Sequence, residues 1–431
     1  MIHMDFGKDY SVLSPFKCLF YSDRMKRFAQ GDFYDIRPVT VHLVPTLRCN
    51  HKCFFCTYGG LKDSCMKQNV HKKTMDAALI YKTLDQLSDN GIKGVIFTGG
   101  GEPTLYPNLI DAMKYCISKG MEAAINTNGH FLSQEMPRDL ITINPTYIRI
   151  SLNAGSAIVQ KLTTGVDDFE LILKNIEKLI LLKNQMKSTT DISIGFVVNV
   201  LNVHELSKLA DVLLKLEAKL RTKYNIENGI YSLQIRPVSN YENSKHINND
   251  ATDKAAGFLR EKYGVSFEEE YYHFMQDGAQ CSKRTLEIAL NTIENDILPR
   301  FNSISNIKII YPKQKYIDLI ENTKRPYNMC LSCPWFLFIW PDGNIYHCVE
   351  WAGTKGFEIG NIQEDSLENI LKSNRRNKVL AEINDSVLKK RCAPVCAHHE
   401  MNLLLNNLKY VDSEEILNQK QKKQYHHVSF L

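Results

Sequence analysis

Three cysteines lie within eight residues of one another and could bind a single metal centre. They are Cys49, Cys53 and Cys56, spaced C-x3-C-x2-C. Residues 39–46 alternate as a β-strand would, so the cysteines fall in the loop that leaves a strand. Three thiolates are one ligand short of the four that a zinc ion or a four-iron cluster usually takes. The spacing therefore indicates a metal centre with one open position, which is typical of a catalytic site.

The spacing of these cysteines is also compatible with two alternatives. The site could hold zinc, with His51 or the more distant Cys65 as the fourth ligand. Alternatively, the three side chains could be unrelated thiols.

A glycine-rich stretch, residues 99–103 (GGGEP), follows a second expected strand at residues 94–98. Glycines let the backbone approach a ligand closely, and the carboxylate of Glu102 could accept hydrogen bonds from an ammonium group. A turn with a solvated Glu102 would account for the stretch equally well if it stood alone.

The two motifs together, with the aromatic Phe55 inside the cysteine motif, resemble the radical S-adenosylmethionine (SAM) superfamily. In that family three cysteines hold a [4Fe–4S] cluster, and SAM binds the fourth iron through its amino and carboxylate groups. The resemblance implies that Cys49, Cys53 and Cys56 are the cluster ligands. It also implies that Glu102 binds the SAM amino group and that Phe55 covers the adenine.

A strand–helix alternation extends over residues 37–240, which is the region that the resemblance covers. It predicts an α/β fold with a parallel sheet, and the resemblance implies a partial (β/α)6 TIM-like barrel. In such sheets the functional residues gather at the carboxyl ends of the strands. The expected strands are 39–46, 94–98, 123–129, 147–153, 192–200 and 231–237, and the expected helices are 74–90, 107–119, 168–184 and 204–216.

Polar residues end several of these strands and form the expected SAM-binding set. Asn199 and Arg236 are expected to face one cavity, because both stand at strand ends with matching parity. For each residue a helix cap or a turn is an equally good interpretation. The full set is Phe55, Gly100, Gly101, Glu102, Asn126, Asn128, Ser151, Asn153, Asn199 and Arg236.

Five further cysteines fall in the last quarter of the chain, around an expected β-hairpin at residues 335–348. This pattern resembles the SPASM/twitch extension of the same family, which holds auxiliary iron–sulfur clusters. It implies one auxiliary [4Fe–4S] cluster, and a four-cysteine zinc ribbon is the alternative. Either Cys330 or Cys333 could be the spare thiol, and the longer interval from Cys330 to Cys348 favours Cys333 as the spare. Four of the following would be ligands: Cys330, Cys333, Cys348, Cys392 and Cys396.

Composition sets limits on the kind of protein. The net charge of +5 is too small to indicate nucleic-acid binding, and no apolar run approaches the about 18 residues of a membrane span. Clustered cysteines in a chain of 431 residues indicate metal binding in a reducing, cytoplasmic compartment. The expected domains are a lead-in segment with a helix over the barrel mouth (1–36), the core (37–240), a linker and substrate-facing region that loses the alternation until residue 305 (241–325), and the auxiliary-cluster domain with its tail (326–431).

The resemblance implies an oxidoreductase that cleaves SAM to a 5′-deoxyadenosyl radical and abstracts hydrogen from an unactivated C–H bond. A small or carbohydrate-like substrate is favoured, because 36 residues are short for a peptide-recognition domain at the N-terminus. A ribosomal-peptide maturase is the alternative, and a non-catalytic metal-binding or redox-sensing protein is the alternative of another class. A flavodoxin or ferredoxin would supply the electron. No catalytic acid or base can be assigned.

Overall fold

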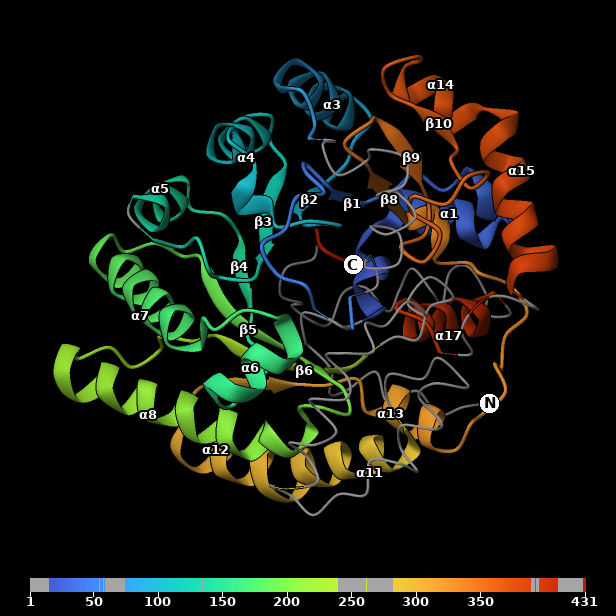
Figure 1. Cartoon of the computed structure of the whole chain (residues 1–431). Helices are drawn as coiled ribbons and strands as arrows, with labels where there is room; N and C mark the ends of the chain where they lie inside the picture. The colour runs from blue at the N-terminus through green and yellow to red at the C-terminus, as the bar shows by residue number, and fades with distance from the viewer. Residues whose placement is uncertain are drawn as a thin grey trace.

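The structure is a computed structural model, and the strands of the part that it describes form one ten-stranded sheet (Figure 1). The strand order is β10-β9-β8-β1-β2-β3-β4-β5-β6-β7. The residues that the structure describes are 15–53, 55–56, 58, 74–133, 135–238, 261, 282–388, 392, 395–409 and 429–431.

Strands β1 to β7 of this sheet run parallel to one another, and the expected α/β barrel architecture is confirmed. Helices cover the outer face of the sheet, as Figure 1 shows. The strands are β1 (Thr40–Leu43), β2 (Gly94–Phe97), β3 (Glu122–Thr127), β4 (Tyr147–Ser151), β5 (Asp191–Val198), β6 (Ser232–Pro237) and β7 (Lys308–Ile310). The helices of this region are α3 (Ala77–Asp89), α4 (Leu109–Ser118), α5 (Met136–Ile143), α6 (Ala157–Thr164), α7 (Phe169–Gln185) and α8 (Leu206–Tyr224).

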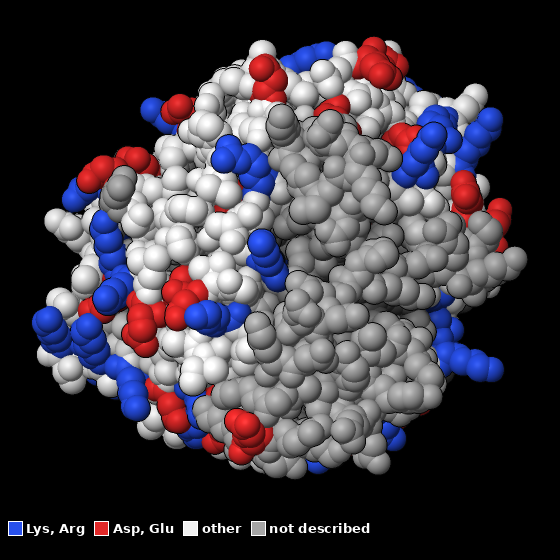
Figure 2. All heavy atoms as spheres, viewed as in Figure 1, with Lys and Arg blue, Asp and Glu red and all other residues white. Residues whose placement is uncertain are grey.

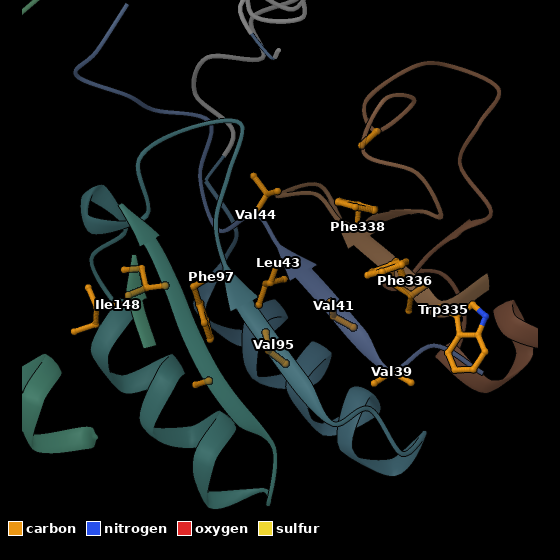
Figure 3. Close-up of a cluster of buried hydrophobic side chains, with 14 of the residues drawn as sticks. Val39, Val41, Leu43, Val44, Val95, Phe97, Ile148, Trp335, Phe336 and Phe338 are labelled. Atoms are coloured by element: carbon orange, nitrogen blue, oxygen red, sulfur yellow. The ribbon is translucent and has the colours of Figure 1, made fainter. Parts of the chain in front are cut away.

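The side chains of β4 show why these residues form a barrel wall. Ile148 and Ile150 are fully buried, and Ile148 lies in the hydrophobic cluster of Figure 3. Tyr147, Arg149 and Ser151 are half-buried and alternate with them. Because neighbouring residues of a strand point to opposite faces, the polar residues line the barrel interior and the isoleucines pack against the helices.

The C-terminal unit joins the barrel sheet directly. The expected hairpin is present: β8 (Phe336–Ile339) pairs antiparallel with β9 (Asn344–Tyr346), and the two-residue β10 (Gly360–Asn361) follows. In addition, β8 lies parallel to β1, with Thr40 opposite Phe336. Figure 3 shows the two strands side by side. The C-terminal unit and the barrel therefore share one continuous β-sheet.

The expected loss of alternation up to residue 305 is wrong for the described part of that region. Helix α11 (Lys283–Thr292), a π-helical turn (Ile293–Ile297) and α12 (Leu298–Ile304) lead into β7, which pairs parallel with β6. The π-turn and the short strand blur the sequence pattern, because neither keeps a regular hydrophobic period for long. A further expected strand at residues 271–275 lies outside the described residues.

The lead-in helix α1 (Ser22–Ala29) lies at the amino ends of the strands, so its expected position over the barrel mouth is wrong. Arg24 fixes this position. Its guanidinium donates to the carbonyl oxygens of Arg37 and Pro38, just before β1, and of Gly91, just before β2. Buried carbonyls that lack sheet partners need such a donor, so α1 closes the end of the barrel opposite the cysteine loop.

Residues 429–431 also lie at the amino end of the barrel. The Phe430 ring packs on Ile96 and Ala124, and its centroid is 5.2 Å from that of Tyr147 in a T-shaped contact. The Phe430 carbonyl accepts a 2.6 Å hydrogen bond from the buried ammonium of Lys17. Residues 429–431 therefore fill the barrel interior at the amino ends of the strands.

The helix at residues 313–320 packs against α11, and the helix at residues 367–372 packs against α3. Charges of both signs mix on the surface. On the face shown in Figure 2, Lys and Arg side chains are interspersed with Asp and Glu. Among the described residues, no helix is long and apolar enough to cross a membrane. The helices after β7 are α13 (Lys313–Ile320), α14 (Leu367–Lys372), α15 (Asn374–Glu382), a π-helical turn (Ile383–Val387) and α17 (His399–Leu408).

Candidate active site

The cysteine loop begins at the carboxyl end of β1, where it touches the glycine-rich stretch after β2. The Glu102 N–H donates a 2.7 Å hydrogen bond to the Arg48 carbonyl, one residue before Cys49. A Cβ at Gly101 would lie 2.4 Å from that same carbonyl and 2.5 Å from the Thr46 carbonyl. Only glycine allows this approach, so the two sequence motifs form one packed unit.

Hydrogen bonds from neighbouring elements hold the cysteine loop in place. Asn128, at the end of β3, donates its side-chain N–H to Asn50 Oδ1 at 2.7 Å. The Lys52 N–H donates to the Thr164 carbonyl at the end of α6, at 2.8 Å. Within the loop, the Cys56 N–H donates to the Cys53 carbonyl at 3.1 Å. Side-chain and backbone hydrogen bonds together thus hold the loop in one conformation.

His51, inside the cysteine motif, belongs to a buried network that the sequence did not predict. Its Nε2 lies 2.7 Å from Asp168 Oδ2, and His130 Nδ1 lies 2.9 Å from the same oxygen. Gln160 Nε2 donates to Asp168 Oδ1 at 3.0 Å. Burial alone would raise the pKa of Asp168, but these three hydrogen bonds outweigh it and lower the pKa. The partners of Asp168 are up to 117 residues away in sequence, so no local spacing reveals them.

This network bears on the zinc alternative for the cysteine loop. His51 Nε2 is within hydrogen-bond distance of a carboxylate and is buried. It therefore serves as an anchor of the loop, while Cys65 lies outside the described residues.

Glu102 is a buried carboxylate surrounded by protein donors. Its Oε1 accepts hydrogen bonds from Thr104 N (3.1 Å), Thr104 Oγ1 (2.7 Å) and Thr127 Oγ1 (2.6 Å). Its Oε2 accepts a bond from Asn128 N at 2.7 Å. A carboxylate offers about four acceptor positions. Glu102 therefore ties the end of β2 to the end of β3, a role beyond the SAM contact expected from the sequence.

Some of the expected SAM-binding residues face the barrel interior. Asn126 on β3 donates to Thr98 Oγ1 at 3.2 Å, and its Oδ1 is buried without a partner among the described residues. Phe55 and Arg236 line a cavity at the carboxyl ends of the strands. Ser151 is half-buried at the end of β4.

Two other members of the expected set are engaged in local structure. Asn199 is fully buried; its Nδ2 donates to the Val197 carbonyl, and its Oδ1 accepts from Leu201 N. Asn153 Oδ1 accepts a 2.8 Å bond from Val197 N. The expectation that Asn199 shares the cavity with Arg236 is therefore wrong, because its amide is used within the turn after β5.

The cavity has a volume of about 420 Å³ and lies between the cysteine loop and the C-terminal unit. Cys56 lines it from one side and Cys396 from the other. Among its polar walls are Lys315, on α13, and His398. Burial, with the nearby charge of Lys315, lowers the pKa of His398 to about 4, so this imidazole is neutral at pH 7. Neither residue lies in a recognisable motif, so the sequence alone does not indicate them.

The C-terminal cysteines converge as expected. Cys330 Sγ lies 3.1 Å from Cys333 Sγ, and Cys333 in turn interacts with Cys348. The hydrogen bond from Cys333, followed by weaker ones from Ser332 and Asn402, lowers the pKa of Cys330 to about 6 against the effect of burial. Cys392 and Cys396 are close enough to the other thiols for charge on Cys348 and Cys330 to act on them.

Both groups of cysteines fit the expected clusters by their chemistry. The loop of three cysteines leaves one iron of a four-iron cluster open, and the buried Asn126 Oδ1 offers an acceptor at the same rim. The five C-terminal thiols exceed the four that one auxiliary cluster takes.

Comparison with known proteins agrees with this geometry. Residues 43–210 match the radical SAM superfamily, and residues 335–398 match the SPASM domain, an iron–sulfur cluster-binding domain. The Fe-coproporphyrin III synthase of Methanosarcina barkeri is 28% identical over 179 residues, which is 42% of this chain and 41% of that protein. A probable GTP 3′,8-cyclase of Thermococcus kodakarensis is 30% identical over 145 residues, 33% of this chain and 45% of that protein. The chain spans about half the length of the curated relatives it matches.

A solved structure extends the similarity to almost the whole fold. Streptococcus suis SuiB, bound to its precursor peptide SuiA, superposes with a TM-score of 0.55 at 14% identity, over 92% of this chain and 76% of SuiB. At this identity the likeness concerns the fold alone. The two domain matches, in agreement with the two groups of cysteines, show that this chain belongs to the radical SAM superfamily and carries a C-terminal SPASM domain.

Proposed function

We propose that the protein cleaves SAM reductively and removes hydrogen from an unactivated C–H bond of a small or carbohydrate-like substrate. An auxiliary cluster would assist a net oxidation or a bond formation. When bound, the reduced cluster and SAM supply a 5′-deoxyadenosyl radical, which is the hydrogen-abstracting species. A reductant such as flavodoxin or ferredoxin would deliver the electron. The single observation that carries this proposal is the cavity lined by both Cys56 and Cys396.

In this proposal the protein supplies ligands and a fixed geometry. Cys49, Cys53 and Cys56 would hold the first cluster, on a loop anchored at Arg48 and His51. The motif residues and the interior polar groups would hold SAM, through Phe55, Gly100, Gly101, Glu102, Asn126, Asn128, Ser151 and Arg236. Asn153 and Asn199 are proposed to support this rim, since the Asn153 amide bonds to the backbone of β5 and the Asn199 amide to the turn that follows it.

The second cluster would be held by four of the five C-terminal cysteines. These are Cys330, Cys348, Cys392 and Cys396, with Cys333 as the spare. This choice follows from the longer interval between Cys330 and Cys348, which gives the hairpin more room to close around the cluster.

The cavity favours a small substrate. Its volume of about 420 Å³ lies in the range of about 300–1,000 Å³ for small-molecule sites. SAM would take the part of this cavity near Phe55 and Arg236, and beside it Lys315 gives a basic wall and Phe336 an apolar one.

A peptide substrate is the second candidate, and one observation favours it. The SuiB structure that shares this fold is bound to a precursor peptide. The genes next to this one would separate the candidates. A short open reading frame encoding a peptide that the protein modifies would favour the maturase, whereas neighbouring glycosyltransferase genes would favour carbohydrate chemistry.

The test of the proposed reaction is a protein with Cys49, Cys53 and Cys56 all changed to Ala. We expect it to release no 5′-deoxyadenosine from SAM under reducing, anaerobic conditions, and to keep about four irons per chain in the auxiliary site. Cys116→Ala is the matched control, because Cys116 is a buried thiol of α4 that belongs to neither cysteine group. SAM cleavage that persists in the triple variant would refute the proposal. A wild-type protein that binds iron but never cleaves SAM would indicate a non-catalytic redox protein instead.

A further inference from the structure

Three buried asparagines hold the loop that carries Cys330. Asn384 Oδ1, in the π-helical turn after α15, accepts a 2.6 Å hydrogen bond from the Cys330 N–H. Asn402 and Asn406 both project from α17, one turn apart. Since one face of α17 thus supplies two amides to a single loop, the helix acts as a template for that loop.

The two asparagines of α17 make different contacts with the loop. Asn406 Nδ2 donates to two carbonyl oxygens, those of Met329 and Asn402, each at 2.9 Å. Asn402 Oδ1 accepts from the Ser332 N–H at 3.0 Å, and its Nδ2 points at a sulfur atom, 3.6 Å from Cys330 Sγ. Only 1% of Asn402 is exposed, so water cannot replace its amide.

An N–H group directed at a cluster-ligating sulfur has a defined physical effect. Reduction adds negative charge to the cluster and its thiolates, and a fixed N–H dipole stabilises the more negative state more strongly. Hydrogen bonds to the sulfur atoms therefore raise the reduction potential of an iron–sulfur cluster. Low dielectric around a buried donor increases the effect.

We propose that Asn402 is a positioning residue of the auxiliary site: its Nδ2–H bonds to the Cys330 thiolate, orients it as a cluster ligand and raises the reduction potential of the auxiliary cluster. The inference rests on the proposed function, since it assumes iron at the C-terminal cysteines. It goes further by naming the residue that makes this cluster easier to reduce, and hence a better electron acceptor.

The test compares Asn402→Leu with the matched control Asn406→Leu in the full-length, iron-loaded protein. Each variant removes one buried amide from the same helix, but only Asn402→Leu removes the donor to sulfur. The midpoint potential of the auxiliary cluster is measured by a redox titration followed by electron paramagnetic resonance. The triple cysteine variant identifies which signal belongs to that cluster.

We expect Asn402→Leu to shift the reduction equilibrium about tenfold toward the oxidised cluster, which is about 59 mV for a one-electron couple. Asn406→Leu should leave the potential unchanged. If Asn402→Leu fails to fold, Asn402→Asp keeps the acceptor for Ser332 and replaces the donor by a carboxylate oxygen, so it should lower the potential as well.

Two results would overturn the inference while leaving the proposed function intact. One is an unchanged potential in iron-replete Asn402→Leu. The other is an equal shift in Asn406→Leu, which would mean that any loosening of the loop alters the cluster. Zinc in place of iron in the wild-type site would instead refute the auxiliary cluster itself, and the inference with it.

Discussion

The substitution Glu102→Gln tests the double role of the buried carboxylate between β2 and β3. Glu102 accepts two backbone N–H bonds, from Thr104 and Asn128, one on each oxygen. An amide offers one oxygen and one NH2 group, so either rotamer of Gln leaves one of these N–H groups facing a donor. The hydroxyls of Thr104 and Thr127 can rotate and accept instead.

The expected cost follows from that single unpaired group. A buried N–H left without an acceptor costs about 1–3 kcal/mol. We therefore expect Glu102→Gln to lower the free energy of unfolding of the cluster-free protein by about 2 kcal/mol. Glu122→Gln is the matched control, because Glu122 accepts only from the hydroxyls of Thr146 and Ser429, at 3.1 and 2.9 Å, among the interactions described for it. Its free energy of unfolding should stay close to that of the wild type.

Two measurements separate the structural role of Glu102 from SAM binding. Urea unfolding followed by circular dichroism reports the stability of the two variants. Equilibrium binding of SAM to iron-loaded protein reports the ligand contact, which we expect to weaken in Glu102→Gln while the iron content stays intact. Equal stability of Glu102→Gln and the wild type would refute the hydrogen-bond reasoning. Unchanged SAM affinity would refute the proposed contact with the amino group.

Three further predictions concern the C-terminal unit and its attachment. Cys333→Ala should cost less iron than Cys330→Ala by metal analysis, and the opposite order would show that Cys333 is the ligand. The Glu368 carboxylate, paired with Arg37 across 331 residues, has its pKa lowered to about 2 by that hydrogen bond, so its contribution to stability is complete above about pH 4.5 and disappears as the pH falls toward 2. The free energy of unfolding of Glu368→Gln should therefore change less with falling pH than that of the wild type. The difference should be below about 1 kcal/mol because the pair is exposed, and identical pH profiles of the two proteins would exclude the contribution. Phe430→Ala should lower the free energy of unfolding by about 3 kcal/mol, since it empties the amino end of the barrel, and a loss below about 1 kcal/mol in chemical denaturation would show that the ring is dispensable there.

The barrel strands were predictable because each is a short apolar run followed by a turn or polar residue. Residues 94–97, for example, are buried along their whole length, as a strand covered on both faces must be. The exception is β7, where only three residues pair and Lys308 is exposed. So short a strand carries too few residues for a period to emerge.

The pairing of β8 with β1 could not be predicted, because strand partners are chosen by tertiary packing and not by local pattern. For the same reason, the local sequence does not reveal the residues that anchor the cysteine loop. Asp168 reads as the start of a helix, and only the fold brings it to His51. For Asn199, strand parity predicted a side chain directed at the cavity, but its amide oxygen instead accepts a hydrogen bond within the turn after β5.

The parallel pairing of β1 with β8 has a consequence for synthesis of the chain on the ribosome. Thr40 meets Phe336, so one edge of β1 has no partner until a segment about 296 residues later has been made. At about 5–20 residues per second, this takes about 15–60 s. Throughout that interval the nascent chain presents an apolar strand edge, which is a template for pairing with other chains. We therefore expect the ribosome-bound chain to recruit chaperones until residue 339 has emerged, and a chain that stops before β8 to aggregate.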